Sequence, residues 1–440
     1  MKPGITVIGG GLAGSEAAWQ IAHRRLDVRL FEMRPEVSTP AHKTGQLAEL
    51  VCSNSFKSDL PGTAPYLLKQ ELRRMGSLLL QVADTEKVPA GHALAVDRER
   101  FCRRVNEEIL RIPQIEIVRE EVRDLPNDGI TIVATGPLTS ESLSNSIGRF
   151  AGAQNLYFYD AVSPIVDAGT LDRSKLFAAS RYGKGGEDYL NAPLSRGEYL
   201  RFYEALMNAE SVPLRQFEKP IFFEGCLPLE ELARRGVDTL RFGPMKPVGL
   251  IDPRTGKRPY AAVQLRTENL MADSYNLVGF QNHLKYPEQS RVFRMIPGLA
   301  TAEFLRFGQI HRNSYIHSPR LLYPTLQTRK SPNLFFAGQI CGVEGYVESI
   351  ATGLIAGINA VRLAEGNEPL SPPRSTACGS LLHYIAFTDT KDFQPVNMSF
   401  GLLGPPAAMK NASRDRKERY RLQVQESLRC MDGWIESLDL

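Results

Sequence analysis

The sequence has few cysteines and no long apolar run, and both shortages narrow the class of protein. Its six cysteines, at positions 52, 102, 226, 341, 378 and 430, form no C-x-x-C pair. A zinc ribbon, a thioredoxin-like motif and a dense secreted disulfide framework therefore lack support. No uncharged apolar stretch approaches the roughly 18 residues of a membrane span, because the best candidate, 349–361, is short and contains Ser, Thr and Asn. We expect a cytoplasmic protein with reduced thiols and no membrane contact.

Metal-binding motifs are also missing. There is no H-E-x-x-H and no cluster of carboxylates, so we expect no metal site. What is present is ordinary for a folded protein: 440 residues, 42% hydrophobic and 23% charged, with a formal net charge of +4. This length and composition predict two to three folded domains and exclude wholesale disorder.

The first 32 residues predict a βαβ unit. An apolar run at 5–8 is followed by a glycine cluster, a helical pattern from Ser15 to Arg25 and a second apolar run at 28–31. Further apolar runs at 115–118, 130–134 and 333–338 suit a buried, mostly parallel sheet. Asp97 can cap a helix that extends to Leu110.

The middle of the chain differs, because it is rich in Pro and Gly and has short alternating runs. We therefore predict an α/β protein in which a discontinuous Rossmann-like domain carries an inserted α+β domain. The predicted parts are 1–160 for the first part of the Rossmann-like domain, 161–324 for the insertion, and 325–440 for the second part, and the motifs below make the discontinuous domain the FAD-binding one. The last segment, from Ser413 onward, has apolar residues spaced by three and four and predicts a helix packed on the main body.

A dinucleotide fingerprint occupies the turn of the βαβ unit. Residues 9–14 read G-G-G-L-A-G and satisfy G-x-G-x-x-G, and Glu32 follows at the end of the next strand. Such glycines allow a tight turn and a close approach to a pyrophosphate, while the acid accepts a hydrogen bond from a ribose hydroxyl. Because a predicted strand precedes the motif and a predicted helix follows it, the motif favours dinucleotide binding over a plain structural turn.

This fingerprint alone does not separate FAD from NAD. The block from Gly338 to Tyr346 favours FAD, because a late strand there delivers a glycine-rich backbone to the start of a helix over 347–363. That helix carries small residues at 351, 353, 356 and 357. The alternative is that these small residues only allow close helix packing.

Several blocks together resemble the folate- and FAD-dependent tRNA (uracil-54-C5)-methyltransferases, the TrmFO family. They occur in order over nearly the whole chain: the glycine-rich start, FEMRP at 31–35, VCSNS at 51–55, FEGCLP at 223–228, GPMKPVGL at 243–250, HRN at 311–313 and the block at 338–346. The wobble-uridine flavoprotein family MnmG is related but has longer chains. Two positions depart from the pattern: Ala192 stands where a cysteine is common, and Cys341 where a threonine is common.

The resemblance implies an enzyme that takes a carbon unit from 5,10-methylenetetrahydrofolate, reduces it with FADH2 and forms ribothymidine at uridine 54 of the tRNA T-loop. NADPH or NADH would re-reduce the flavin. By resemblance, the FAD contacts are Gly9, Gly10, Gly11, Leu12, Ala13, Gly14, Glu32, Val122, Gly338 and Gln339. Two alternatives stay open: the same chemistry on a ribosomal RNA uridine, and a flavin-dependent NAD(P)H oxidoreductase without methyl transfer.

Two cysteines fit this chemistry. Uracil C5 is a poor nucleophile, and a thiolate that adds to C6 creates an enolate with electron density at C5. Cys226 directly precedes a predicted helix with Pro228 in its first turn, a setting that favours a thiolate, and we predict that it attacks C6. Cys52 would serve as acid or base, or exchange roles with Cys226. Tyr346 would assist proton transfer, or only pack on the flavin edge.

The net charge is concentrated in one region. Residues 241–330 contain 14 Lys and Arg against five Asp and Glu, with interleaved aromatic residues. A second basic cluster lies at 410–421, with six basic and two acidic residues. We predict that both contact tRNA through phosphate charge and base stacking, although a solvated basic face with inward-facing aromatic rings is the alternative. We expect no DNA partner, and a monomer or a weak homo-oligomer.

Overall fold

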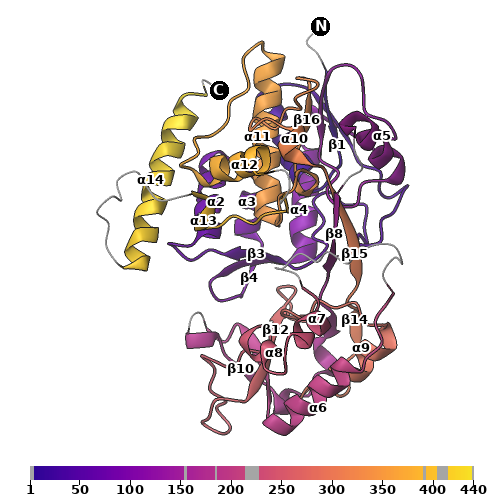
Figure 1. The fold of residues 1–440 in the computed structure, drawn as a ribbon, viewed down its shortest axis with the longest axis vertical. Coiled ribbons are helices and arrows are strands. Elements are labelled where there is room, and N and C mark those ends of the chain that lie inside the picture. Colours follow the sequence, from indigo (N-terminus) through magenta and orange to yellow (C-terminus); the bar gives the residue numbers. More distant parts are fainter. Residues whose placement is uncertain are drawn as a thin grey trace.

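The chain forms two lobes around separate hydrophobic cores in this computed structural model, which describes residues 4–152, 156–183, 186–213, 227–389, 393–403 and 415–438 (Figure 1). The larger core combines residues from the first 147 positions with residues after Tyr315. The smaller core uses residues from Val166 to Ala302. The larger lobe is thus built from both ends of the chain.

A five-stranded parallel sheet forms the centre of the larger lobe. Its order is β16-β7-β1-β2-β6, with β1 (Ile5–Ile8), β2 (Val28–Phe31), β6 (Ile115–Val118), β7 (Ile130–Val133) and β16 (Leu334–Phe336). Every residue of β1 and β7 is buried, as expected for central strands covered on both faces. The predicted strands and the discontinuous α/β fold are confirmed, because β16 pairs in parallel with β7 about 200 residues before it.

The predicted helices after β1 and β16 lie directly against one another. They are α1 (Leu12–His23), which begins three residues before the predicted start, and α11 (Tyr346–Ala364). A Cβ atom on Gly353 would lie 2.1 Å from the Ala13 carbonyl oxygen, so only glycine allows this approach. By length and hydropathy α11 would meet the criteria for a membrane span, but most of it is buried in the core.

The remaining elements of the larger lobe cover this sheet. Asp97 caps α4 as predicted, since its side chain accepts a hydrogen bond from the Arg100 N–H at 3.0 Å. The terminal helix is also confirmed, and it buries Val424 and Met431, while Leu438 is buried two residues after its end. These helices and strands are α2 (Ala64–Arg74), α3 (Leu78–Thr85), α4 (Arg98–Leu110), α5 (Glu141–Ala151), α10 (Ser318–Leu321), α12 (Ala377–Phe387), α13 (Phe400–Leu403), α14 (Arg416–Glu436) and the small sheet of β3 (Ser55–Ser58), β5 (Ala93–Val96) and β4 (Lys87–Val88).

The smaller lobe is an antiparallel sheet with helices, which fits the predicted α+β insertion. Its sheet order is β10-β11-β12-β13-β9-β14. The strands are β9 (Ile165–Asp167), β10 (Phe177–Ala178), β11 (Tyr189–Leu194), β12 (Ala261–Thr267), β13 (Ser274–Leu277) and β14 (Phe304–Arg306), and the helices are α6 (Arg196–Met207), α7 (Leu229–Arg234), α8 (Thr239–Phe242) and α9 (Tyr286–Phe293).

Two paired strands join the lobes. They are β8 (Leu156–Ala161), which leads into the smaller lobe, and β15 (Ile310–Tyr315), which leads back to the larger one (Figure 1). The limits 161–324 for the insertion stay a prediction.

Candidate active site

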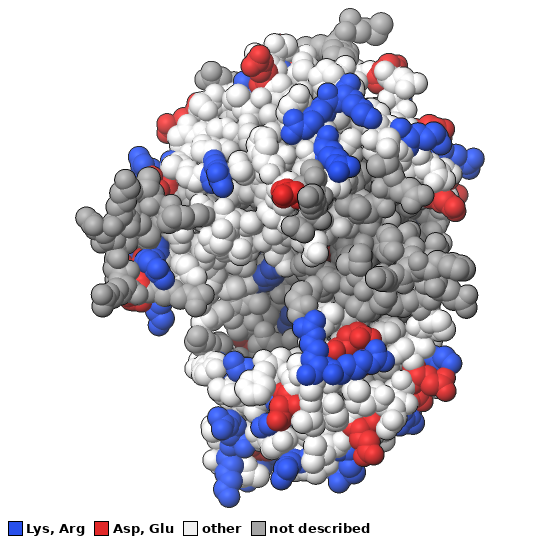
Figure 2. All heavy atoms as spheres, viewed as in Figure 1, with Lys and Arg blue, Asp and Glu red and all other residues white. Residues whose placement is uncertain are grey.

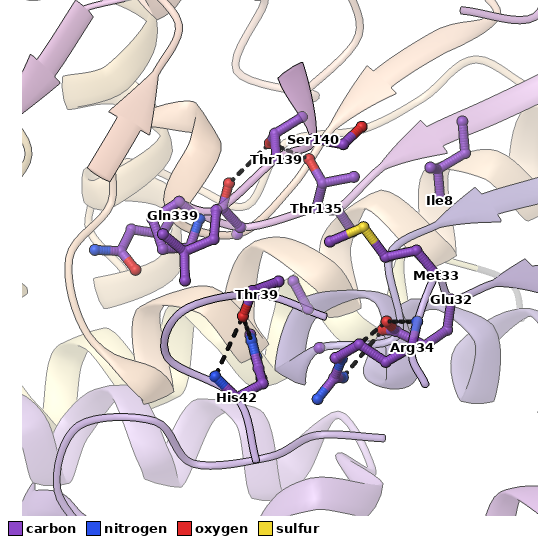
Figure 3. A pocket seen from close by; sticks show the side chains of 18 of the residues that line it. Ile8, Glu32, Met33, Arg34, Thr39, His42, Thr135, Thr139, Ser140 and Gln339 are labelled. Atoms are coloured by element: carbon purple, nitrogen blue, oxygen red, sulfur yellow. Dashed lines mark hydrogen bonds and ion pairs between the residues drawn. The ribbon is translucent and has the colours of Figure 1, made fainter. Parts of the chain in front are cut away.

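A cavity opens where β1, β2, β7 and β16 end, at the carboxyl edge of the parallel sheet (Figure 3). About 1000 Å³ of free space, part of it open solvent, lies between its walls. Most of the predicted site residues line it: Gly9, Gly11, Leu12, Ala13, Glu32, Val122, Gly338, Gln339 and Tyr346. Gly10 and Gly14 lie behind this lining.

The glycines of the first turn serve different purposes. Gly9 has a positive φ of 105°, and a Cβ atom there would lie 2.6 Å from the Ala134 carbonyl oxygen. A Cβ atom on Gly14 would lie 1.8 Å from the Gly9 carbonyl oxygen. A Cβ atom on Gly11 would meet nothing within 4 Å, because it would point into open space. The fold therefore requires Gly9 and Gly14, whereas Gly11 keeps space free for a ligand.

The amino terminus of α1 faces the same cavity. Its N-cap is Gly11, so no side chain in the described part of the chain caps it. The first backbone N–H bonded within this turn is that of Ser15, which donates to the Gly11 carbonyl. The N–H groups of residues 11–14 and the positive end of the helix dipole make this terminus suitable for an anion, and its contact with a pyrophosphate stays a prediction.

Glu32 closes the turn from the side of β2. Its carboxylate accepts hydrogen bonds at 2.9 Å from the Gly10 N–H and from Nε of Arg34. Burial alone would raise the pKa of Glu32, but the hydrogen bonds and charge of Arg34 outweigh it and lower that pKa. Glu32 therefore stays ionised at neutral pH and can accept hydrogen bonds from ribose hydroxyls.

Two groups of polar lining residues were not predicted from the sequence. Thr39 and His42 follow β2 and are hydrogen-bonded at 2.6 Å, and Thr135 and Thr139 follow β7 and are also hydrogen-bonded at 2.6 Å (Figure 3). Thr135 and Thr139 could have been predicted from the sequence, because they directly follow the predicted strand at 130–134. The segments after buried parallel strands meet at the same edge of the sheet.

The late glycine block reaches the cavity from β16. Gly338 has a φ of 82°, its N–H donates to the Thr352 hydroxyl at 2.8 Å, and Gln339 lies beside it in the lining. Gly353 and Gly357, in contrast, serve the contact between α1 and α11. The close-packing interpretation is therefore confirmed for Gly353 and Gly357, while contact of Gly338 and Gln339 with FAD stays a prediction.

The two departures from the family pattern do not line the cavity. Ala192 is fully buried on β11. Cys341 is also fully buried, and its thiol donates to the Gly338 carbonyl at 2.9 Å. Burial raises the pKa of Cys341 to about 12, so this cysteine stays an unreactive thiol.

Cys52 lies next to the cavity through its neighbours Val51 and Tyr346, which both line it. The Cys52 N–H donates to the Tyr346 hydroxyl oxygen at 2.9 Å. Burial, and then the neighbouring Cys52, raise the pKa of Tyr346, so its hydroxyl keeps its proton. Cys226 lies outside the described residues. The helix predicted after it is present as α7, with Pro228 as N-cap, but the pairing of the two cysteines stays a prediction.

The basic region of the smaller lobe is less aromatic at its surface than the sequence pattern indicated. Phe280 lies in the core of the smaller lobe and Tyr315 in the core of the larger lobe, whereas Phe242 is 82% exposed and Tyr286 is 46% exposed. Figure 2 shows basic side chains over this lobe with acidic side chains beside several of them, and a hollow between the lobes. The prediction that aromatic rings stack on RNA bases is therefore wrong for the buried rings. For Phe242 and Tyr286, which are exposed, it stays a prediction.

Within the described residues, no group of three or more His, Cys, Asp or Glu side chains could hold a metal ion.

Comparison with known proteins supports the assignment at two levels. The family described as Glucose inhibited division protein A matches residues 4–368. GidA from Aquifex aeolicus in its form II crystal has a TM-score of 0.72, at 19% identity, over 100% of this chain and 74% of that chain. Fold and cavity together define a flavoprotein-type dinucleotide-binding protein with the GidA fold.

Closer relatives identify the family within this class. Methylenetetrahydrofolate--tRNA-(uracil-5-)-methyltransferase TrmFO of Koribacter versatilis is 58% identical over 433 residues, 98% of each chain. The protein of that name from Solibacter usitatus is 58% identical over 444 residues and all of both chains, and the one from Enterococcus faecalis is 55% identical over 439 residues. The chain belongs to the TrmFO family.

Proposed function

We propose that this protein methylates C5 of the T-loop uridine at position 54 of tRNA, with 5,10-methylenetetrahydrofolate as carbon donor and FADH2 as reductant, and forms ribothymidine. The observation that carries this proposal is the 55–58% identity to TrmFO proteins over nearly the whole chain. The carboxyl-edge cavity supports it, because its glycine turns and ionised Glu32 fit a dinucleotide.

The cavity fits FAD at three places. The uncapped start of α1 would receive the pyrophosphate, Glu32 would bind a ribose, and Gly338 with Gln339 would lie beside the flavin portion. When bound, FADH2 supplies the reducing equivalents that turn the transferred carbon unit into a methyl group. NADPH or NADH regenerates it in this proposal.

The chain's own residues activate the uracil. A Cys226 thiolate adds to C6, and C5 then attacks the electrophilic carbon of the folate. Cys52 removes the proton from C5, and the bond between the transferred carbon and the folate nitrogen breaks, so that tetrahydrofolate leaves and a methylene group remains on C5. A hydride equivalent, which bound FADH2 would supply, turns this methylene group into a methyl group, and the bond between C6 and the Cys226 sulfur breaks as the ring double bond returns. Tyr346 holds the backbone of Cys52 through its hydroxyl.

A donor comparison tests the function. Unmodified tRNA transcript is incubated with the flavin-loaded protein, NADPH and either labelled methylenetetrahydrofolate or labelled S-adenosylmethionine. We expect label in the tRNA only with the folate donor, and none in a transcript whose position 54 is cytidine. Product with S-adenosylmethionine alone, or transfer to ribosomal RNA but not to tRNA, would contradict the proposal.

The roles of the two cysteines can be tested separately. With RNA that contains 5-fluorouridine at position 54, loss of the C5 proton is blocked and the thiol adduct at C6 accumulates. We expect the Cys52→Ala variant to form this adduct and the Cys226→Ala variant to form none. The reverse result would exchange the two roles.

A further inference from the structure

Two arginines from different lobes hold the backbone of Cys52. Arg98, at the start of α4, donates from Nη2 to the Cys52 carbonyl oxygen at 3.2 Å, and its Nη1 donates to the Leu50 carbonyl. Arg306, at the end of β14, donates to the same Cys52 oxygen at 2.8 Å and to the Val51 carbonyl at 3.2 Å. Since the Cys52 N–H is bound by Tyr346, both backbone groups of this residue are fixed.

Of these two arginines, only Arg98 has an ion-pair partner in the described part of the chain. Arg98 forms an ion pair with Glu268 at 2.8 Å. Arg306 has no carboxylate within ion-pair distance in the described part of the chain, and its buried Nε has no hydrogen-bond partner there. Burial, followed by the nearby charge of Arg98, lowers the pKa of Arg306. Partial burial of a cation that has no ion pair, next to another cation, costs free energy, and the charge of Glu268 offsets part of that cost.

We propose that Arg306, together with Arg98, is a positioning residue that orients Cys52 and favours its thiolate form. This inference rests on the proposed function, in which a Cys52 thiolate accepts the proton from C5 and becomes a thiol. Positive charge beside a cysteine favours the thiolate, which is the form able to accept that proton. The thiol returns its proton to solvent after the methylated base has left. The carboxylate of Glu268 limits this effect, because it neutralises Arg98.

The rate of Cys52 alkylation as a function of pH tests the proposal. Holoprotein without RNA or folate is treated with iodoacetamide, and the Cys52 peptide is quantified by mass spectrometry. We expect Arg306→Gln to raise the alkylation midpoint by about one pH unit, with a roughly tenfold slower reaction below the midpoint. Arg306→Lys should keep the midpoint close to that of the wild type, because it keeps the charge.

Arg294→Gln is the matched control. Arg294 also donates twice to one backbone carbonyl in the smaller lobe, that of Ala302 at 3.0 and 3.2 Å, but does not contact residues 50–52. We expect this variant to alkylate as the wild type does.

The variant Glu268→Gln tests the effect of the arginine charges on Cys52 independently, and it replaces Arg306→Gln if that variant does not fold. Removing this carboxylate leaves the charge of Arg98 unopposed, so the midpoint should fall. An unchanged midpoint in the folded variants overturns the proposal. Because the assay needs no methyl transfer, a shifted midpoint in a protein that fails to methylate tRNA would contradict the proposed function and leave the effect of the arginines standing.

Discussion

Gly11 and Gly14 belong to one turn but are subject to different constraints. Gly14 is in contact with the Gly9 carbonyl, so a side chain there must displace backbone. Gly11 has backbone angles that any residue can adopt, with φ −74° and ψ −167°, and open space beyond its Cα. The fold thus depends on Gly14, whereas the proposed contact with FAD depends on Gly11.

Exchange of each glycine for alanine should separate these two roles. We expect Gly11→Ala to weaken FAD binding by about tenfold, or about 1.4 kcal/mol, without lowering the stability of the flavin-free protein. Gly14→Ala should cost about 1–3 kcal/mol of stability through overpacking. Flavin fluorescence titration and thermal unfolding of the flavin-free protein measure the two effects. A Gly11→Ala variant with unchanged FAD affinity would place the pyrophosphate elsewhere.

The role of Tyr346, either in holding Cys52 or only in packing, can be tested by removing its hydroxyl oxygen. The change Tyr346→Phe keeps the ring and deletes the acceptor of the partly buried Cys52 N–H, which costs about 1 kcal/mol, the lower end of the range for a group left unpaired. We expect single-turnover methyl transfer to slow by about tenfold or more, while FAD affinity stays the same. Tyr66→Phe, a change outside the cavity lining, is the control. A wild-type rate for Tyr346→Phe would leave only a packing role.

At the scale of elements, one buried carboxylate joins three helices. Glu71 on α2 accepts hydrogen bonds from the Ala377 and Cys378 N–H groups at the start of α12, at 2.7 and 2.8 Å, and from the Ser427 hydroxyl on α14 at 2.9 Å. It is fully buried, and burial raises its pKa to about 7 against the opposing effect of these hydrogen bonds. The terminal helix is therefore attached through a group that titrates near neutral pH.

This carboxyl should make stability depend on pH. The folded protein keeps the Glu71 proton between pH 4.5 and about 7, where the unfolded chain has released it. The contribution of Glu71 to the free energy of unfolding therefore falls by about 3 kcal/mol as the pH rises through this window, and it stays low at higher pH. We expect Glu71→Gln to remove that part of the difference in unfolding free energy between pH 5 and pH 8. The exposed Glu204→Gln should change nothing, and equal profiles for Glu71→Gln and wild type would contradict the assignment.

Elements were predictable where their pattern is local. Asp97, the β1 run and the apolar stripe of α14 each carry their signal within a few residues, and each is present as predicted. Glu71 gives no such signal, because its partners lie more than 300 residues away and a lone glutamate in a helical pattern suggests a solvent-exposed face.

At the scale of the whole molecule, the residues at the carboxyl edge of the parallel sheet were predictable from the sequence. The contact that the smaller lobe makes with Cys52 was not. Gly10 of the glycine turn and Glu32 are separated by 22 residues, and a known fold relates them. Arg306 reaches Cys52 across 254 residues and from the other lobe. Charge counts place Arg306 in a basic region, yet only the fold distinguishes it from arginines at the surface.

The same distinction applies to the RNA-binding surface. Several cations of the basic region are neutralised: Lys285 lies 2.5 Å from Glu210 and Arg291 lies 2.6 Å from Glu288. Lys257 and Arg258 are exposed and have no ion pair in the described part of the chain. Figure 2 shows both situations, with blue side chains next to red ones and others standing alone. Unpaired cations release more counterions from RNA phosphates, so we expect them to supply most of the affinity.

The double variant Lys257→Ala/Arg258→Ala should therefore bind tRNA about tenfold more weakly, with a salt slope smaller by about two. The matched control, Lys285→Ala/Glu210→Ala, removes both partners of one ion pair and leaves the net charge unchanged. If unpaired cations supply the affinity, this control should keep a tRNA affinity and a salt slope close to those of the wild type. Fluorescence anisotropy with labelled tRNA at several salt concentrations measures both quantities. A first variant with wild-type affinity and slope would exclude this face of the smaller lobe as a tRNA contact and direct attention to the basic cluster at 410–421.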